Sequence, residues 1–256
     1  MAVISIKNKL RRGNLLVGNL GFGQPVPGYS LWLDASDSAT VSLSGSNVTA
    51  WLDKSNNGHN FTASSGKEPL YVTNLQNSKP GIKFFPSSSI KFLTNTSLGN
   101  WSESLFTVFF VFNSTNTGGN YPALLGRNSL GALQIGGNNA GPSKLSISKI
   151  GTATQDSSLS YTGNNADVAV YKATAASTSS VTVQTYKNGT AASATITQGS
   201  LTSTGNKNSI GASNEGAGDY MASDAYLCEI ILYSSSLSDT DRNLVETYLK
   251  TKWATP

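Results

Sequence analysis

The feature that most constrains the fold is a series of short apolar runs, which begins near residue 28 and continues almost to the end of the chain. Clusters of Gly, Asn and Ser separate the runs, and Ser, Thr, Asn and Gly together make up 112 of the 256 residues. These residue types favour turns and are poor helix formers, which excludes a helical bundle. Strands that follow one another at such short intervals predict a β-sandwich or jelly roll and not a βαβ fold.

One of the expected strands, 105–112, is apolar almost throughout, which predicts a central strand covered on both faces. Another, 181–186, precedes the pair Asn188-Gly189, which is a strong hairpin signal between two extended runs. The other expected strands are 29–33, 48–52, 70–72, 81–85, 90–93, 123–125, 132–135, 145–150, 168–171, 194–197, 209–211 and 226–233. The side chains expected in the core are Phe106, Phe109, Phe110, Phe112 and Cys228, and those expected in the core or packed at an edge are Trp32, Trp51, Trp101 and Trp253.

A single helix is expected, over residues 238–253. Ser238 can cap its N-terminus, and Asp241 follows three residues later, as in a capping box. Acidic residues in the first turn and basic residues in the last turn complement the helix dipole. We expect the helix to lie across one end or edge of the sandwich and to bury the stripe that recurs at helical spacing, Leu244, Val245, Tyr248, Leu249 and Trp253.

The basic character of the chain belongs to its N-terminus. No acidic residue precedes Asp34, and residues 28–256 hold 14 basic and 14 acidic side chains, so the net charge of +4 comes from residues 1–27. A domain without a net positive charge has little electrostatic attraction for the phosphate backbone of a nucleic acid, so we expect no nucleic-acid partner. No apolar run reaches the roughly 18 residues that a membrane span needs, so we expect no membrane insertion.

Residues 1–27 are expected to form an extended arm ahead of the domain 28–256. Basic residues come first, then an apolar, glycine-spaced stretch, then two prolines. Two interpretations stay open, a disordered terminus and an arm that becomes ordered when it docks on a larger assembly. The second is favoured because exposed linkers avoid such apolar residues, and its docking residues are Lys7, Lys9, Arg11, Arg12, Leu15, Leu16, Val17 and Phe22.

Several segments together point to a known fold family. They are LWLDASD at 31–37, WLDKSNNG at 51–58, PGIKF at 80–84, and a closing stretch in which EIILY at 229–233 leads into VETYL at 245–249 and then Lys252-Trp253. In these segments the chain resembles the concanavalin A-like, laminin G-like jelly rolls of bacterial and bacteriophage proteins. The resemblance implies an all-β jelly-roll β-sandwich with one short C-terminal helix. It implies little about function, because this fold serves lectins, glycosidases and structural proteins alike.

The N-terminal SIKNKLRRGNLLVGN segment is similar to leader segments of bacteriophage virion proteins. That similarity implies a virion component whose arm binds capsid or tail proteins and whose sandwich faces outward, with many copies as a homo-oligomer and weak binding of cell-surface glycans. The alternative is a secreted carbohydrate-binding or adhesion module with an extracellular location. A glycan-active hydrolase or lyase is the least favoured interpretation.

No catalytic residues can be assigned from the sequence, and we expect no enzyme and no cofactor. Glycosidases need two carboxyl groups that converge on one bond, and the glucanases of this fold carry them on alternate positions of one strand. The five Glu residues here lie far apart along the chain, and none has an Asp two residues away. A Ser-His-Asp triad would depend on the single histidine, His59, which lies in a polar turn.

Two kinds of binding site are candidates. Asp53 begins a DKSNNG segment that is similar to the first half of a calcium loop, so Asp53 and Asn57 could hold Ca²⁺, the alternative being a turn closed by their own side chains. Sugar binding needs an aromatic platform beside amides or carboxylates, in loops where binding residues concentrate. The candidates for it are Tyr121, Asn138, Asn139, Asp219 and Tyr220.

Overall fold

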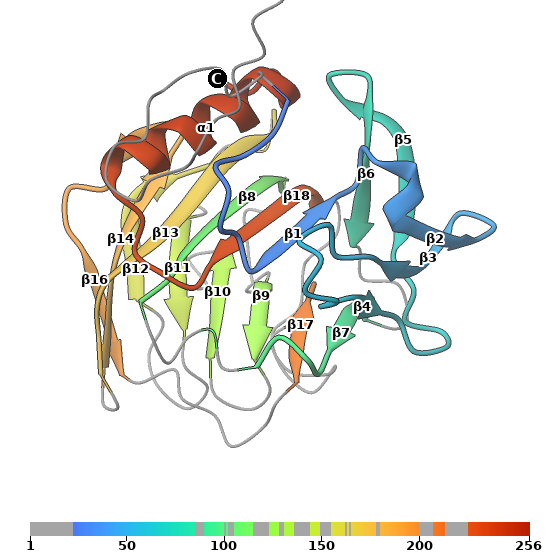
Figure 1. The fold of residues 1–256 in the computed structure, drawn as a ribbon, viewed down its shortest axis with the longest axis horizontal. Coiled ribbons are helices and arrows are strands. Elements are labelled where there is room, and N and C mark those ends of the chain that lie inside the picture. The colour runs from blue at the N-terminus through green and yellow to red at the C-terminus, as the bar shows by residue number, and fades with distance from the viewer. Residues whose placement is uncertain are drawn as a thin grey trace, which may run out of the picture.

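Figure 1 shows the computed structural model of the chain. It describes residues 23–84, 90–99, 101, 105–114, 123–127, 131–135, 144–148, 155–161, 163, 165–177, 180–199, 207–212 and 225–256. Strands dominate these residues. The described part of the chain has one α-helix, α1 (Asp239–Trp253), and the short 3-10 helix η1 (Ser38–Thr40) follows β1. The described part contains no helix that is both long and apolar enough to cross a membrane.

The strands match the expected runs closely where those runs are apolar. They are β1 (Leu31–Asp34), β2 (Val41–Ser44), β3 (Asn47–Trp51), β4 (Phe61–Thr62), β5 (Leu70–Gln76), β6 (Lys79–Phe84), β7 (Leu93–Asn95), β8 (Thr107–Asn113), β9 (Ala123–Arg127), β10 (Gly131–Ile135), β11 (Lys144–Ser148), β12 (Gln155–Ser160), β13 (Asp167–Ala176), β14 (Ser180–Lys187), β15 (Thr190–Ala191), β16 (Ile196–Gly199), β17 (Asn208–Ile210) and β18 (Ala225–Tyr233). The sequence did not predict β2, β4, β12 and β15, because β2, β4 and β15 have only two to four residues each and β12 is mainly polar.

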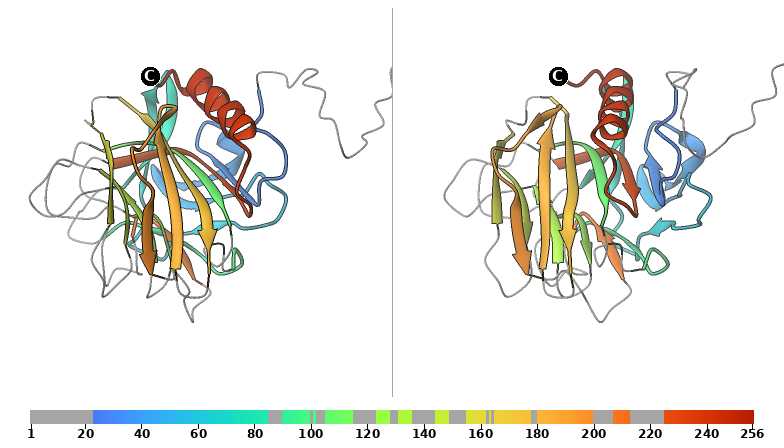
Figure 2. Two further views of the ribbon diagram at one scale, coloured as in Figure 1. Left: turned by 90° about the vertical axis from the view of Figure 1, so that its left-hand side faces the viewer. Right: turned by 60° about the vertical axis from the view of Figure 1, so that its left-hand side comes forward.

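All the strand pairings among the described residues are antiparallel, and they build the two layers of a jelly-roll β-sandwich (Figures 1 and 2). In one layer β18 lies between β8 on one side and β1 and β6 on the other, and the layer continues through β13 and β14. The other layer runs from β3 through β4, β7, β17, β9, β10 and β11 to β12. The predicted all-β fold class is confirmed.

Strand β8 shows how the core is divided. Val108, Phe110 and Phe112 point into the main core between the two layers, whereas Phe109 and Val111 point into a second apolar cluster on the outer face of the same layer. Every residue of β8 is buried. The prediction of a central strand covered on both faces is confirmed, and so is the burial of the four tryptophans, the four phenylalanines and the cysteine expected in the core.

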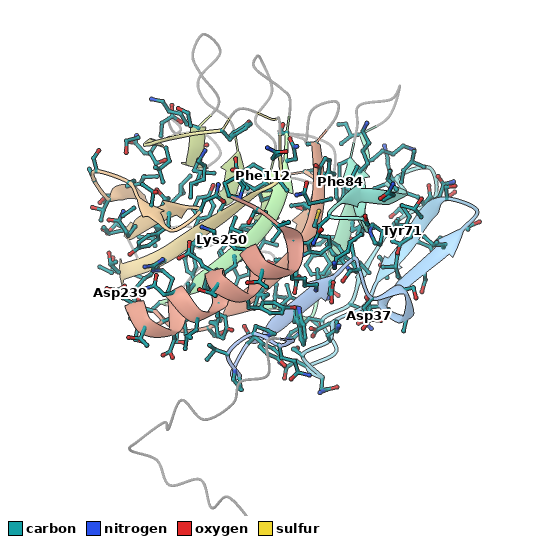
Figure 3. All side chains as sticks on the ribbon, turned by 90° about the horizontal axis from the view of Figure 1, so that it is seen from above. Asp37, Tyr71, Phe84, Phe112, Asp239 and Lys250 are labelled. Carbon is teal, nitrogen blue, oxygen red and sulfur yellow. The ribbon has the colours of Figure 1, made fainter. Side chains whose placement is uncertain are left out.

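Helix α1 supplies the cover of that outer face. The second cluster includes four side chains of the helix, Val245, Tyr248, Leu249 and Trp253, which cover the outward side chains of β8 and β13. Figure 3, in which the molecule is viewed from above, shows the helix lying across these strands. The expected position at an end or edge of the sandwich is therefore wrong. The physical reason is that Phe109, Val111 and their neighbours give the outer face an apolar surface that must be covered.

The N-terminus of α1 is capped as predicted. The Ser238 hydroxyl accepts a hydrogen bond from the backbone N–H of Asp241 at 3.0 Å. We expect Ser238→Ala to lower the free energy of unfolding by about 1 kcal/mol, because this N–H then has no protein acceptor. Urea unfolding followed by circular dichroism measures the change. Ser44→Ala, at an exposed position of β2, is the control, and an equal effect of the two substitutions would contradict the assignment of the cap.

The predicted hairpin at Asn188-Gly189 is also present. Both residues have positive φ, 51° and 91°, and they join β14 to β15 with Lys187 opposite Thr190. The Asn188 side chain then fixes the turn to β13, since its Oδ1 accepts from the backbone N–H of Val168 at 2.8 Å. A local turn signal and a long-range contact thus agree at this position.

Candidate functional site

A buried carboxylate, Glu229, lies at the centre of the most polar region between the sandwich and α1. Its side chain has no exposed surface, and both oxygens accept two hydrogen bonds each. Oε1 accepts from Trp32 Nε1 at 2.7 Å and from the Tyr248 hydroxyl at 2.9 Å. Oε2 accepts from Lys252 Nζ at 2.7 Å and from Trp253 Nε1 at 2.6 Å. The carboxylate therefore joins β18 to β1 and to the last two turns of the helix.

The backbone explains why Glu229 faces the helix. In β18 the side chains of Ile230 and Leu232 enter the main core, while those of Ile231 and Tyr233 face α1. A register shift between Leu227 and Glu229 marks a β-bulge against β8, so Cys228 and Glu229 are both on the helix side. Bulges re-aim side chains in this way.

Strand β1 places a second carboxylate directly beside the first. Asp34 is the register partner of Glu229, and it is 3% exposed. Like charges opposite each other destabilise a strand pair unless a cation lies between them. Here Lys252 supplies that cation, because its Nζ lies 2.8 Å from Asp34 Oδ1 as well as 2.7 Å from Glu229 Oε2.

Asp34 also binds side chains of the loops that follow β1 and β3. Oδ1 also accepts from the Ser36 hydroxyl at 2.6 Å, and Oδ2 accepts from Lys54 Nζ at 2.9 Å. Lys54 in turn binds Asp37 at 2.8 Å and lies over the Trp32 ring, 4.4 Å from its centroid. We call the connected set Trp32, Asp34, Lys54, Glu229, Tyr248, Lys252 and Trp253 the Glu229 network.

The surroundings shift the pKa values of Glu229 and Asp34 in opposite directions. Burial raises the pKa of Glu229, and the hydrogen bonds and charge of Lys252 only partly oppose it. Burial alone would also raise the pKa of Asp34, but the charge of Lys252 and hydrogen bonds from Lys252, Ser36 and Lys54 outweigh burial and hold that pKa below 3.8. Asp34 is thus the firmly ionised member of the pair.

The depressed pKa of Asp34 gives a pH-dependent prediction. As the pH falls, the unfolded chain protonates this carboxyl before the folded chain does, so its stabilising contribution is complete above about pH 3.8 and is lost as the pH falls through the folded-state pKa. We expect Asp34→Asn to cost about 2 kcal/mol of unfolding free energy at pH 7. The difference from the native chain should narrow below pH 3.8. Urea unfolding across this pH range measures it, and a constant difference would contradict the assignment.

A cleft of about 560 Å³ opens over this network, and we call it the β1 cleft. Asp34, Lys54 and Lys252 line its charged side, and Tyr29 and Trp32 line its aromatic side, where their rings meet edge to face at 5.2 Å. Its remaining side-chain lining includes Gln24, Ser36 and Asn56. The volume is within the range of small-molecule sites. The cleft thus combines aromatic surface, neutral amides and charges that are already paired.

The loop that follows β3 takes the turn arrangement that was the alternative to calcium. The Asp53 carboxylate accepts from the backbone N–H groups of Trp32, Ser55 and His59 at 2.9–3.0 Å and from the Ser55 hydroxyl at 2.6 Å. The Asn57 amide nitrogen donates to the Ser55 hydroxyl within the loop and to the backbone carbonyl of Ser30, which precedes β1. In the described residues no group of three or more His, Cys, Asp or Glu side chains is placed to hold a metal ion. A calcium site at Asp53 and Asn57 stays a prediction, and the turn accounts for both side chains without an ion.

The other predicted site residues lie outside the described residues. This applies to the glycan-binding candidates Tyr121, Asn138, Asn139, Asp219 and Tyr220, and to the docking residues of the arm, Lys7, Lys9, Arg11, Arg12, Leu15, Leu16, Val17 and Phe22. They stay predictions. Conversely, the β1 cleft was not recognised from the sequence, although Asp34 and Glu229 each stand out as an acid within an apolar strand. That contrast is the signal that could have indicated a shared polar site.

Two packed antiparallel layers and a covering C-terminal helix define a jelly-roll β-sandwich. No protein-family model and no curated protein sequence matches the chain. Solved structures do match its fold. One, from work titled "Cell entry of botulinum neurotoxin type C is dependent upon interaction with two ganglioside molecules", has a TM-score of 0.56 at 14% identity, over 87% of this chain and 51% of that chain.

Two further matches have similar scores. The binding domain of botulinum neurotoxin DC in complex with rat synaptotagmin II has a TM-score of 0.54 at 15% identity, over 87% of this chain and 51% of that chain. A Trypanosoma rangeli sialidase in complex with the inhibitor DANA has a TM-score of 0.53 at 13% identity, over 91% of this chain and 34% of that chain. The chain thus spans only a third to a half of the length of these proteins, and at such identities the likeness concerns the fold alone.

Proposed function

We propose that this chain is a non-enzymatic, lectin-like virion protein of a bacteriophage, held on the particle by its N-terminal arm and binding surface glycans through its sandwich. The observation that carries the binding role is the β1 cleft, in which aromatic side chains and neutral amides surround charges that are already paired. Two of the matched folds support a sugar ligand in general, without indicating its class, because their titles name gangliosides and a sialidase.

The hydrogen bonds of the two buried carboxylates favour binding over catalysis. A glycosidase needs one carboxyl group free to donate a proton and another free to attack or to activate water. Glu229 instead receives four hydrogen bonds from side chains of this chain, and Asp34 is held by Ser36, Lys54 and Lys252. Both oxygens of Glu229 already accept two hydrogen bonds each, and the two lysines hold the pKa of Asp34 below its usual range, so Asp34 is a poor proton donor.

The phage assignment depends on the arm. Its basic and apolar residues resemble a virion leader segment, and the rest of the chain carries no net charge. A capsid or tail protein is the partner that such an arm would bind, and many copies on one particle would raise the avidity of weak sugar binding. A secreted carbohydrate-binding module would use the same cleft but would give the arm no role.

A glycan array probed with the full chain tests the binding role. We expect binding that withstands a calcium chelator, because Asp34, the carboxylate that lines the β1 cleft, is already paired with Lys54 and Lys252. We also expect no change in the mass of the bound oligosaccharides after prolonged incubation. Released sugar would overturn the non-enzymatic assignment. A folded chain that binds no glycan on the array would overturn the lectin assignment.

A separate experiment tests the arm. In a phage whose genome encodes this chain, we expect mass spectrometry of purified particles to detect the native protein. A variant with Lys7, Lys9, Arg11 and Arg12 all replaced by alanine should be synthesised but absent from the particles, because the basic contacts are lost. Equal incorporation of the two forms would refute docking through these residues, and absence of the native chain from particles would refute the virion role.

A further inference from the structure

We propose that the β1 cleft binds a neutral hexopyranose residue, through the Tyr29 hydroxyl and the amides of Gln24 and Asn56, and that it rejects acidic sugars. This inference rests on the proposed glycan-binding function, for which it supplies the site and the class of sugar. The loop residues predicted from the sequence to bind glycans have no part in it.

The charges around the cleft argue against an acidic ligand. Asp34, Asp37 and Glu229 contribute three negative charges, against two positive charges from Lys54 and Lys252. The region is therefore net negative when all five groups are ionised, and it repels a carboxylate such as that of a sialic acid.

The two lysines have little left to offer an anion. Lys252 has three donor positions, and they are directed to Asp34, Glu229 and the Tyr248 hydroxyl at 2.8, 2.7 and 3.2 Å. Lys54 binds Asp34 and Asp37 and packs over the Trp32 ring. An acidic sugar would have to compete with carboxylates that are already in place, and breaking a partly buried pair of this kind is costly.

The groups that remain for a ligand are neutral. Within the described part of the chain, the side chains of Gln24, Tyr29 and Asn56 form no hydrogen bond, although all three line the cleft. Each amide both donates and accepts, and so does a phenol hydroxyl. Sugar hydroxyls also do both, so these three groups match a neutral hexopyranose better than they match a ligand of one charge or one hydrogen-bonding type.

The aromatic side of the cleft suits the apolar, C–H face of a sugar ring. Tyr29 is half-buried and contacts both Trp32 and Tyr233 edge to face, with ring centroids 5.2 and 6.3 Å away. These contacts fix the Tyr29 ring before any ligand arrives, which lowers the entropy lost on binding. A pyranose presents C–H groups on one face and hydroxyls around its rim, so apolar surface and amides are needed side by side, as they are here.

Two substitutions remove the proposed ligand contacts with little effect on the fold. Tyr29→Phe deletes only a hydroxyl and keeps the ring contacts. Asn56→Gly deletes an exposed amide at a residue with φ of 68°, where glycine is tolerated without strain. Asn74→Gly is the matched control, because Asn74 is also exposed, also has positive φ (54°), and lies in β5, away from the lining of the cleft.

The test uses the full chain and saturation-transfer NMR titrations with the methyl glycosides of glucose, galactose and mannose, and with N-acetylneuraminic acid as the acidic probe. We expect at least one neutral glycoside to bind and the acidic probe not to bind. Tyr29→Phe and Asn56→Gly should each weaken binding roughly 5-fold, and together roughly 25-fold, as expected for one hydrogen bond apiece. Asn74→Gly should bind as the native chain does, and unfolding curves confirm that all variants are folded.

The outcomes separate the site from the function. If the native chain binds a neutral glycoside and both cleft variants bind it equally well, the cleft is not the site, while the lectin function stands. If only the acidic probe binds, the sugar class is wrong. If the glycan array and every probe fail with folded protein, the proposed function itself is overturned, and the site falls with it.

Discussion

Replacing Glu229 by alanine is expected to lower the free energy of unfolding by about 3–5 kcal/mol, because the substitution removes one partner of a buried ion pair. The side chain has no exposed surface and accepts hydrogen bonds from Trp32, Tyr248, Lys252 and Trp253. Its loss leaves four donors without this acceptor, one of them an ammonium that is only 15% exposed. Buried donors without an acceptor are costly, and Lys252 would keep only Asp34 as its carboxylate partner.

Urea unfolding at pH 7 measures this change in free energy, and two further variants serve as comparisons. Glu229→Gln keeps the shape and one carbonyl acceptor, so its cost should lie between those of the native chain and Glu229→Ala. Glu68→Ala removes a partly exposed carboxylate outside the network and should change the free energy of unfolding by less than about 0.5 kcal/mol. If Glu229→Ala cost no more than Glu68→Ala, the network would not be what fixes the helix to the sandwich.

The parts of the fold that were predictable are those governed by local rules. Apolar alternation located most strands, the Asn188-Gly189 pair located a hairpin, and Ser238 located the start of α1. Each of these signals acts over a few residues. The short strand β2 and the polar strand β12 were not predicted, although each pairs with a strand adjacent to it in the sequence. β2 has only four residues and β12 is mainly polar, so their own residues carry too weak a strand signal, and strand formation depends on the packing context.

The candidate site was less predictable, for a geometric reason. Asp34 and Glu229 are almost 200 residues apart, and only the register of β1 on β18 makes them neighbours. The bulge at Cys228 then decides that Glu229 faces α1, and a shift by one residue would have directed it into the main core. Lys252 could be read from the sequence as a helix-dipole partner, but its role between two carboxylates depends on that register.

The position of α1 could not be predicted either, because it too depends on a contact between segments that are distant in the sequence. The sequence showed an apolar stripe on α1 and an apolar strand at β8, and it showed that the strand needed cover on both faces. It did not show that the stripe was the missing cover. The second apolar cluster, where Val245 and Leu249 meet Phe109 and Val111, joins these two predictions into one contact.

Trp253 is the residue at which the apolar cluster and the Glu229 network meet, so Trp253→Ala should also cost about 3–5 kcal/mol of unfolding free energy. The indole is fully buried in the second apolar cluster, and its Nε1 donates to Glu229 Oε2 at 2.6 Å. Truncation removes both the packing and the hydrogen bond. The end of the helix is further held by Gln76, which donates to the Trp253 carbonyl at 2.9 Å and does not depend on the indole.

A second substitution at the same position separates packing from hydrogen bonding. Trp253→Phe keeps most of the aromatic volume but leaves Glu229 with one donor fewer, so it should cost only about 1–2 kcal/mol in urea unfolding. Thr251→Ala, at an exposed position of the same turn, serves as the control and should stay within about 0.5 kcal/mol of the native chain. If the Phe variant were as unstable as the Ala variant, the network rather than the apolar cluster would dominate the docking of α1. If the Phe variant cost nothing, the indole hydrogen bond to Glu229 would contribute nothing measurable, and packing alone would hold the helix over β8 and β13.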